Sequence, residues 1–330
     1  QWRNQTRRES CQDHATFATY CRGGSTLNKR KTTGFTLVEI LVVLVVISIL
    51  IGLLYPALKG GMARAKKTTE LNAIKQVGAA WAMYSVSNLD RLMPGHITTE
   101  MQEHWDVAWA YPDETLIPPA PFYQESDPNI AGSYPWRLLD RMNNRWETLI
   151  DYKKRTWNAM QVNEHAEEIA TIPAFGYNGY YLGGFWDTDS HFNKPKLRYS
   201  QVLLQHGEVE NVVARVASQI TTPTNTVVFC SSFYGQEGKH LHLSDDTDGY
   251  HLAVPRILAN IVQWEPRSDG VEIFVETSPP LGRHNGMPAI FFADGHVDDV
   301  QIYDLANQQM WIPKARDMGN TPASDFSHSE

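Results

Sequence analysis

The stretch KRKTTGFTLVEILVVLVVISILIGLLYPALKG, residues 29–60, decides the fold of this chain. Three basic residues lead to a glycine, and the long apolar run that follows holds a single carboxylate, Glu39. The 24 residues from Phe35 to Leu58 would form a helix of roughly 36 Å, enough to cross a bilayer core of about 30 Å. The segment therefore predicts one membrane-spanning helix. Its basic flank places residues 1–34 on the cytoplasmic side.

An ordinary secretory signal is the first alternative for this segment, with cleavage after Ala65. The apolar core of such a signal has roughly 7–15 residues, whereas residues 40–55 alone form a longer run without any charge. A plain membrane anchor is the second alternative, but it leaves Glu39 unexplained. A charge at the bilayer centre costs about 2.5–3.5 kcal/mol, and less near the interface. The carboxylate therefore suggests a function beyond anchoring.

The string KTTGFTLVE, which ends at Glu39, resembles the cleavage and methylation signal of type IV pilins and type II secretion pseudopilins. The resemblance implies that a membrane peptidase cuts between Gly34 and Phe35 and methylates the new amine of Phe35. It also implies that Glu39 faces this amine in a neighbouring subunit. Two opposite charges about 4 Å apart gain on the order of 4 kcal/mol at an effective dielectric of 20. Pro56 matches the helix-breaking proline that these subunits often carry.

The same resemblance implies the partners and the location of the protein. The partners would be other pilin or pseudopilin subunits, the prepilin peptidase, an inner-membrane assembly platform and membrane lipid. The chain would cross the inner membrane once and place its body in the periplasm, or at the cell surface within a filament. A leader of 34 residues is longer than most such signals, which predicts a true start nearer Lys29.

Charge and cysteine content narrow the range of functions. Residues 35–330 carry 22 basic and 35 acidic residues, a net charge of −13. Nucleic acid is therefore not an expected partner, because phosphate binding needs a basic surface. Cys230 is the only cysteine beyond the apolar segment, so no disulfide framework can form in the body. We expect a packed, inert thiol at this position.

The chain is predicted to have three parts and an α+β fold. Residues 1–34 form a leader that is removed, residues 35–88 the transmembrane helix and an amphipathic stem, and residues 89–330 a periplasmic or extracellular body. Apolar residues spaced by three and four extend the stem to about Ser87: Leu71, Ile74, Val77, Trp81 and Tyr84. The charged residues of the stem are placed on its other faces: Lys66, Lys67, Glu70 and Lys75.

We expect the stem to pack on a small antiparallel sheet that carries large loop and helical insertions. The proline-rich residues 94–135 are predicted to form an irregular loop, and residues 136–170 show a helical pattern. Strands are predicted at residues 225–230 and 271–276, with a last pair within residues 288–302. A polar tail follows the last hairpin.

His284, followed after nine residues by Asp294 and Gly295, resembles the H-x9-DG signature of pseudopilin-like proteins abundant in planctomycetes. The pair Asp294-Gly295 between two apolar runs predicts a hairpin with a type I′ turn, which needs two residues at positive φ. We expect the motif to be a fold element. The alternative is a metal site of His284, Asp294 and His296, which would make the protein an anchored metal-dependent hydrolase.

Residues 244–249, SDDTDG, are similar to the start of a calcium loop. Their candidate ligands are Ser244, Asp246 and Asp248. However, Pro255 stands where a calcium loop needs its bidentate glutamate. A solvated acidic loop is therefore the expected structure, with calcium as the alternative and no other cofactor.

The motifs of common enzyme classes are missing, because the sequence has no G-x-S-x-G, no P-loop and no H-E-x-x-H. The protein is therefore predicted not to be an enzyme. The favoured function is a subunit of a type II secretion pseudopilus or a type IV pilus-like filament, processed after Gly34. The alternative is a membrane-anchored polysaccharide-binding protein, in which some of the 10 Trp and 14 Tyr line a glycan-binding face.

Overall fold

The computed structural model describes residues 34–98, 101, 132–143, 145–150, 165–188, 194–203, 209–242, 249–258, 261–283, 286–314 and 327–328. The chain divides into two units, one ending at Tyr55 and one beginning at Pro56. The second unit contains the C-terminal part of the first helix and all of the β-strands among the described residues.

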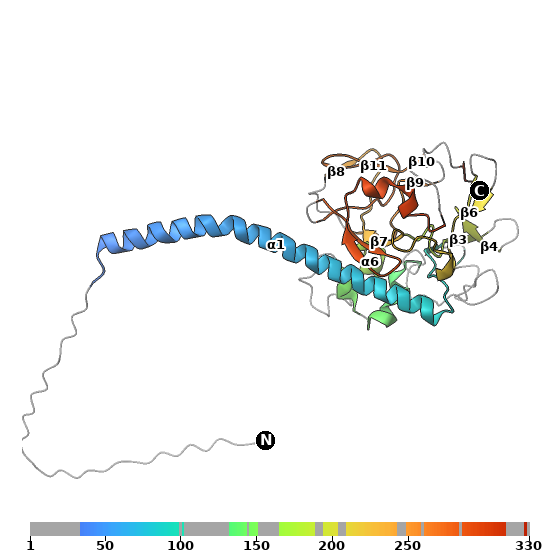
Figure 1. The fold of residues 1–330 in the computed structure, drawn as a ribbon, viewed down its shortest axis with the longest axis horizontal. Coiled ribbons are helices and arrows are strands. Elements are labelled where there is room, and N and C mark those ends of the chain that lie inside the picture. Colours follow the sequence, from blue (N-terminus) through green and yellow to red (C-terminus); the bar gives the residue numbers. More distant parts are fainter. Residues whose placement is uncertain are drawn as a thin grey trace, which may run out of the picture. The chain divides into compact units, whose positions relative to one another are not determined.

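Helix α1 runs from Leu37 to Ser87 over 51 residues, which confirms the predicted end of the stem (Figure 1). Pro56 lies inside α1, so the helix continues through this proline to the predicted end of the stem. The helix ends where Leu89 and Asp90 take left-handed φ values of 56° and 62°. The amide of Asp90 donates to the carbonyl of Ser85 at 2.9 Å and so closes the last turn.

The C-terminal part of α1 runs along the body (Figure 1) and buries the predicted apolar stripe. Ile74, Val77, Trp81 and Tyr84 are all buried, and Leu71 is half-buried. The indole of Trp81 donates to the hydroxyl of Tyr177 at 3.2 Å. The stripe therefore forms one wall of the main hydrophobic core.

A four-stranded antiparallel sheet lies at the centre of the body, in the order β14-β13-β7-β2. Its strands are β2 (Phe175–Tyr177), β7 (Val227–Ser231), β13 (Ala289–Phe292) and β14 (Val297–Asp299). All residues of β2, β7 and β13 are buried. These strands confirm the predictions for residues 225–230 and 288–302. Continuous apolar runs of this length are typical of buried strands.

The described part of the body also contains smaller sheets. β1 (His96–Ile97) is parallel to β3 (Phe185–Thr188), which pairs with β4 (Pro195–Arg198). The other three sheets are antiparallel. They consist of β8 (His240–His242), β11 (Trp264–Pro266) and β12 (Gly270–Ile273); of β9 (Ile257–Leu258) and β10 (Ile261–Val262); and of β5 (Gln201–Leu203), β6 (Val209–Asn211) and β15 (Ser327–His328).

The long helix suggested by residues 136–170 does not form in the described part of this range. The chain instead makes short turns of helix: α4 (Pro135–Leu138), η1 (Leu139–Met142), η2 (Trp146–Thr148) and α6 (Ala166–Thr171). Asn143 has a left-handed φ of 52° and ends η1. Trp136 and Trp146 then meet edge to face with ring centroids 5.0 Å apart. Further short helices are η4 (Ala217–Gln219), η5 (Asp304–Ala306) and η6 (Gln308–Met310).

The hairpin between β13 and β14 forms as predicted, but its turn differs. The amide of Phe292 donates to the carbonyl of His296 at 3.0 Å, which leaves a loop of three residues, 293–295. Gly295 has a φ of 95°, whereas Asp294 has a negative φ. The predicted type I′ turn is therefore wrong. A three-residue loop needs one left-handed residue, and glycine supplies it.

Gly78 of α1 allows the helix to approach the central sheet closely. A Cβ atom at this position would lie 2.2 Å from Cε2 of Phe291 on β13. Gly78 is buried, and Phe291 belongs to the main core. The absence of a side chain at residue 78 therefore sets how deeply the stem sits against the sheet.

We predict that Gly78→Val lowers the melting temperature of the full chain in detergent, because the added methyl groups collide with Phe291. Overpacking of this kind costs about 1–3 kcal/mol. Ala79→Val on the exposed side of the same turn is the matched control and should cost less. A Gly78→Val protein as stable as the control would contradict the close contact.

Candidate functional site

Gly34 and Phe35, the predicted processing residues, precede the first residue of α1. A side chain added at Gly34 would meet nothing within 4 Å. Phe35 exposes 81% of its surface. The fold itself therefore does not require a glycine at position 34, and a requirement for one must come from outside the folded chain.

Glu39 caps the start of α1 through Thr36. Its Oε2 accepts hydrogen bonds from the amide of Thr36 at 2.7 Å and from the hydroxyl of Thr36 at 2.8 Å. The hydroxyl oxygen of Thr36 accepts in turn from the amide of Glu39 at 3.2 Å. This reciprocal arrangement is a capping box. The spacing Thr-x-x-Glu is the signal of this capping box in the sequence.

The first half of α1 carries a long exposed apolar surface. Among the described residues, α1 is the one helix long and apolar enough to cross a membrane. Every residue from Phe35 to Leu58 is exposed. An exposed apolar surface of this extent needs a covering of lipid or protein.

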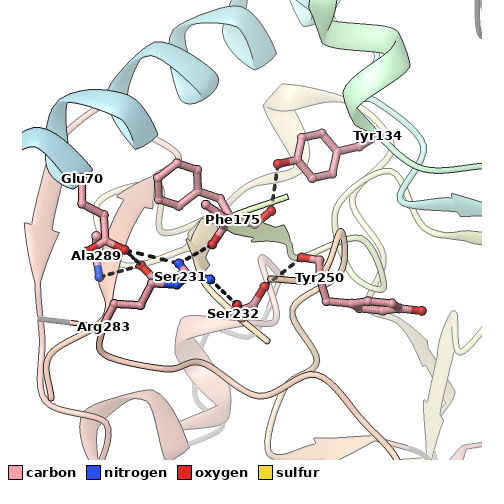
Figure 2. A network of polar contacts seen from close by, with 9 residues as sticks. Glu70, Tyr134, Phe175, Ser231, Ser232, Tyr250, Arg283 and Ala289 are labelled. Carbon is pink, nitrogen blue, oxygen red and sulfur yellow. Dashed lines mark hydrogen bonds and ion pairs between the residues drawn. The ribbon is translucent and has the colours of Figure 1, made fainter. Parts of the chain in front are cut away.

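A second polar site lies where the stem meets the sheet (Figure 2). Oε1 of Glu70 on α1 lies 3.4 Å from Nη1 of Arg283, and both side chains are at least nine-tenths buried. The hydroxyl of Ser231 on β7 donates to the same carboxylate oxygen at 2.7 Å. We call these residues, Glu70, Arg283 and Ser231, the stem junction.

Backbone groups of the sheet complete the stem junction (Figure 2). Arg283 donates to the carbonyl of Ala174, beside β2, at 2.6 Å and to the carbonyl of Ser232, beside β7, at 2.7 Å. The amide of Ala289 on β13 donates to the hydroxyl of Ser231 at 3.3 Å. One guanidinium thus connects the stem with the residues that flank two strands of the central sheet. The desolvation cost of a buried ion pair is offset when hydrogen bonds of this kind surround it.

The prediction that Glu70 lies on another face of the stem is wrong. Glu70 is buried, and it precedes Ile74 by four residues and Val77 by seven. It therefore lies on the apolar stripe itself. Its spacing from Ile74 and Val77 is the feature of the sequence that could have predicted its burial. Lys67 is also half-buried and forms an ion pair with Asp299 of β14. By contrast, Lys66 and Lys75 are exposed, as expected.

The residues proposed for metal binding are only partly described. His284 and the calcium-loop candidates Ser244, Asp246 and Asp248 lie outside the described residues. Nδ1 of His296 lies 2.5 Å from Oδ1 of Asp294, and its ring stacks on Phe292. In the part of the chain that is described, no three His, Cys, Asp or Glu side chains gather where a metal could bind.

Cys230 lies in the middle of β7 and is completely buried. Burial raises the pKa of its thiol well above the ordinary value, although the charge of Arg283 opposes this shift. The thiol therefore stays protonated and shielded from reagents. This confirms the packed, inert cysteine that the sequence predicts.

Aromatic side chains of the body form a row in which each ring contacts the next. Tyr250 contacts His251, His251 contacts His96, and His96 stacks on Phe185, which stacks in turn on Tyr180. A sugar-binding platform needs rings with an open face, whereas these rings cover one another. This row of rings therefore does not form an open sugar-binding platform.

Comparison with known proteins gives two matches. Residues 29–55 match the family model of the prokaryotic N-terminal methylation motif. The chain is also similar to the type II secretion system core protein G of Pseudomonas aeruginosa, with 39% identity over 62 residues. This match covers 19% of the chain and 44% of the relative, so the chain spans less than half of the relative's length. No solved structure matches the chain. The two matches support a pilin- or pseudopilin-like, membrane-anchored protein.

We predict that the two charges of the stem junction depend on each other. Glu70→Leu leaves Arg283 buried without its carboxylate, which should cost about 3–5 kcal/mol of unfolding free energy. The double variant Glu70→Leu/Arg283→Met should lose less than the sum of the two single variants, with a coupling of about 0.5–3 kcal/mol. Denaturant unfolding of the full chain in detergent measures this.

Lys75→Met, on the exposed side of the same helix, is the control for the loss of a charge from the stem. It should change the stability by less than about 0.5 kcal/mol. Additive effects at residues 70 and 283 would show that the ion pair does not hold the stem.

Proposed function

We propose that the protein is a subunit of a filament of the type II secretion pseudopilus or type IV pilus class, assembled through its N-terminal helix. The observation that carries this proposal is the coincidence of two features. The N-terminal methylation motif covers residues 29–55, and α1 begins within it as an exposed apolar helix. A lone membrane anchor would need the apolar helix but not the motif.

Processing after Gly34 is the first step of this proposal. Residues 1–34 are the leader that is removed, residues 35–88 are the transmembrane helix and stem, and residues 89–330 are the body. Gly34 has no structural need for a small side chain, which favours a role in recognition by a prepilin peptidase. Cleavage there would leave the new amine on Phe35, one residue before the capping box.

Glu39 is proposed to have two successive partners. In the single chain its carboxylate accepts hydrogen bonds from Thr36. In the assembled filament it would accept the positive amine of Phe35 from a neighbouring subunit. A helix N-terminus suits an anion in both states. Glu39 would thereby select the axial position of one subunit against the next.

The remaining parts of the proposal follow from the location of the helix. The protein would cross the inner membrane once, with its leader in the cytoplasm and its body in the periplasm or at the cell surface. Its partners would be other subunits, the prepilin peptidase, an inner-membrane assembly platform and lipid. A structural role and not an enzymatic one is what the two matches support. The H-x9-DG motif stays a predicted family signature without an assigned role.

We predict that Gly34→Val blocks processing and leaves a protein that retains residues 1–34. A peptidase that cuts at the membrane surface needs a small residue at this position. Gly60→Val is the control, because a side chain added at Gly60 also meets nothing within 4 Å. Amino-terminal sequencing of the detergent-extracted protein, from cells with a prepilin peptidase, measures the outcome. A mature terminus at Lys66 would indicate ordinary signal peptidase and contradict the proposal.

We predict that Glu39→Leu inserts into the membrane at least as well as the wild type, because it removes a charge from lipid. Crosslinking to wild-type subunits in the same cells should nevertheless fall. Thr36→Val separates the two roles of Glu39, because it removes the hydroxyl of the capping box but keeps the carboxylate. It should retain more crosslinking than Glu39→Leu. Undiminished crosslinking of Glu39→Leu would exclude the proposed pairing with the Phe35 amine.

A further inference from the structure

Two histidines from distant parts of the chain stack on each other, of which His251 is buried and His96 is half-buried. The ring of His96 on β1 lies 5.7 Å from the ring of His251, measured between centroids, with an angle of 25° between the planes. Phe185 on β3 packs on His96 at 4.7 Å, and Tyr250 packs beside His251 at 4.4 Å. The stack therefore joins the first strand of the body to residues 249–253.

The surroundings of the pair favour uncharged imidazoles. Nδ1 of His251 lies 3.1 Å from the carbonyl of Thr171, so this nitrogen carries the proton and Nε2 is left as an acceptor. Within the described part of the chain, Nε2 of His251 and Nδ1 of His96 are buried and have no hydrogen-bond partner. A proton added at either atom would have no acceptor there to stabilise it.

The ionisable groups that act on the pair add to this preference. Arg137 of α4 is buried and carries a positive charge near both rings. Burial, the other histidine and Arg137 lower the pKa of His96 to about 3. Burial lowers the pKa of His251 to about 4, with Arg137 acting in the same direction and the Thr171 hydrogen bond opposing it. Glu276 acts on the neighbouring Tyr250, which stays neutral in this range.

The segment that carries His251 covers the outer edge of the central sheet. β2 is the last strand of that sheet. The amide of Tyr177 on β2 donates to the carbonyl of His251 at 3.0 Å, and the amide of Ala253 donates to the carbonyl of Tyr177 at 2.9 Å. Residues 249–253 thus occupy backbone groups that would otherwise form an open strand edge.

We propose that the His96–His251 stack is a pH-sensitive clasp that holds residues 249–253 over the edge of β2 and releases them in acid. Protonation of one ring would place a positive charge against the other ring and Arg137. The direction of the pH dependence follows from the pKa values of the histidines in the opened and in the closed chain. In the unfolded or opened chain both histidines titrate near pH 6.5, whereas in the closed chain they stay neutral to about pH 4. The clasp is complete above pH 6.5 and weakens as the pH falls.

The first test measures how the unfolding equilibrium of the full chain in detergent changes between pH 6.5 and pH 5. An imidazole that is neutral in the folded chain and protonated in the unfolded chain takes up one proton on unfolding. For each such imidazole the unfolding constant rises about tenfold when the pH falls by one unit. His251→Asn keeps a donor for the Thr171 carbonyl but cannot be protonated, and His96→Phe keeps a ring on Phe185. Each should lower the uptake by about one proton, and the double variant by about two.

His165→Asn is the control for the loss of a histidine outside the stack, because His165 is exposed. A double variant with the same pH dependence as the wild type would overturn the proposal.

A second test locates the opening by hydrogen exchange in the same protein. In the wild type the amides of Tyr177 and Ala253 should lose protection on going from pH 7 to pH 5, after correction for intrinsic rates, while amides in the middle of β7 keep it. In the double variant the loss at Tyr177 and Ala253 should disappear. Unchanged protection of these two amides in the wild type at pH 5 would also overturn the proposal.

Discussion

The ion pair between Glu70 and Arg283 is the contact on which the arrangement of stem and sheet depends. An apolar stripe alone could slide along a sheet, since Val, Ile and Trp side chains tolerate many neighbours. A buried carboxylate cannot, because it must meet its guanidinium and the hydroxyl of Ser231. We infer that the pair selects one register of the stem, a role best known for single polar groups in helical interfaces. The close approach at Gly78 depends on that register.

Local patterns made the elements of the fold predictable. The three- and four-residue spacing of the stem and the apolar runs of β7 and β13 each reflect one kind of burial, so the sequence indicates them directly. The prediction of a long helix failed for residues 136–150 because nearly all of their apolar side chains are buried around short turns. The resulting spacing of apolar residues resembles that of a helix. The turn at Gly295 misled because Asp-Gly fits both two-residue and three-residue loops.

The residues of the candidate sites also divide into those that a local sequence pattern indicates and those that it does not. Gly34, Phe35 and Glu39 lie within six consecutive residues, so the sequence string alone is enough to propose their roles. Glu70 and Ser231 are 161 positions apart in the sequence, so no local sequence pattern predicts their contact. The stacked histidines combine a strand near the stem with a segment late in the chain, and each alone would pass for an ordinary surface histidine. Long-range polar contacts of this kind become visible only in the folded chain.

The capping box at Thr36 has a consequence for how subunits would associate. The carboxylate of Glu39 is already satisfied in the single chain, so a neighbouring amine gains only the difference between two sets of contacts. The net gain in free energy from replacing one partner of Glu39 by another is therefore small for a single pair of subunits, and the contact is easily reversed. In a filament of the proposed kind, lasting cohesion would then have to come from many subunits acting together. Two subunits that met alone in the bilayer would then separate again, which would protect the unassembled subunits from premature aggregation.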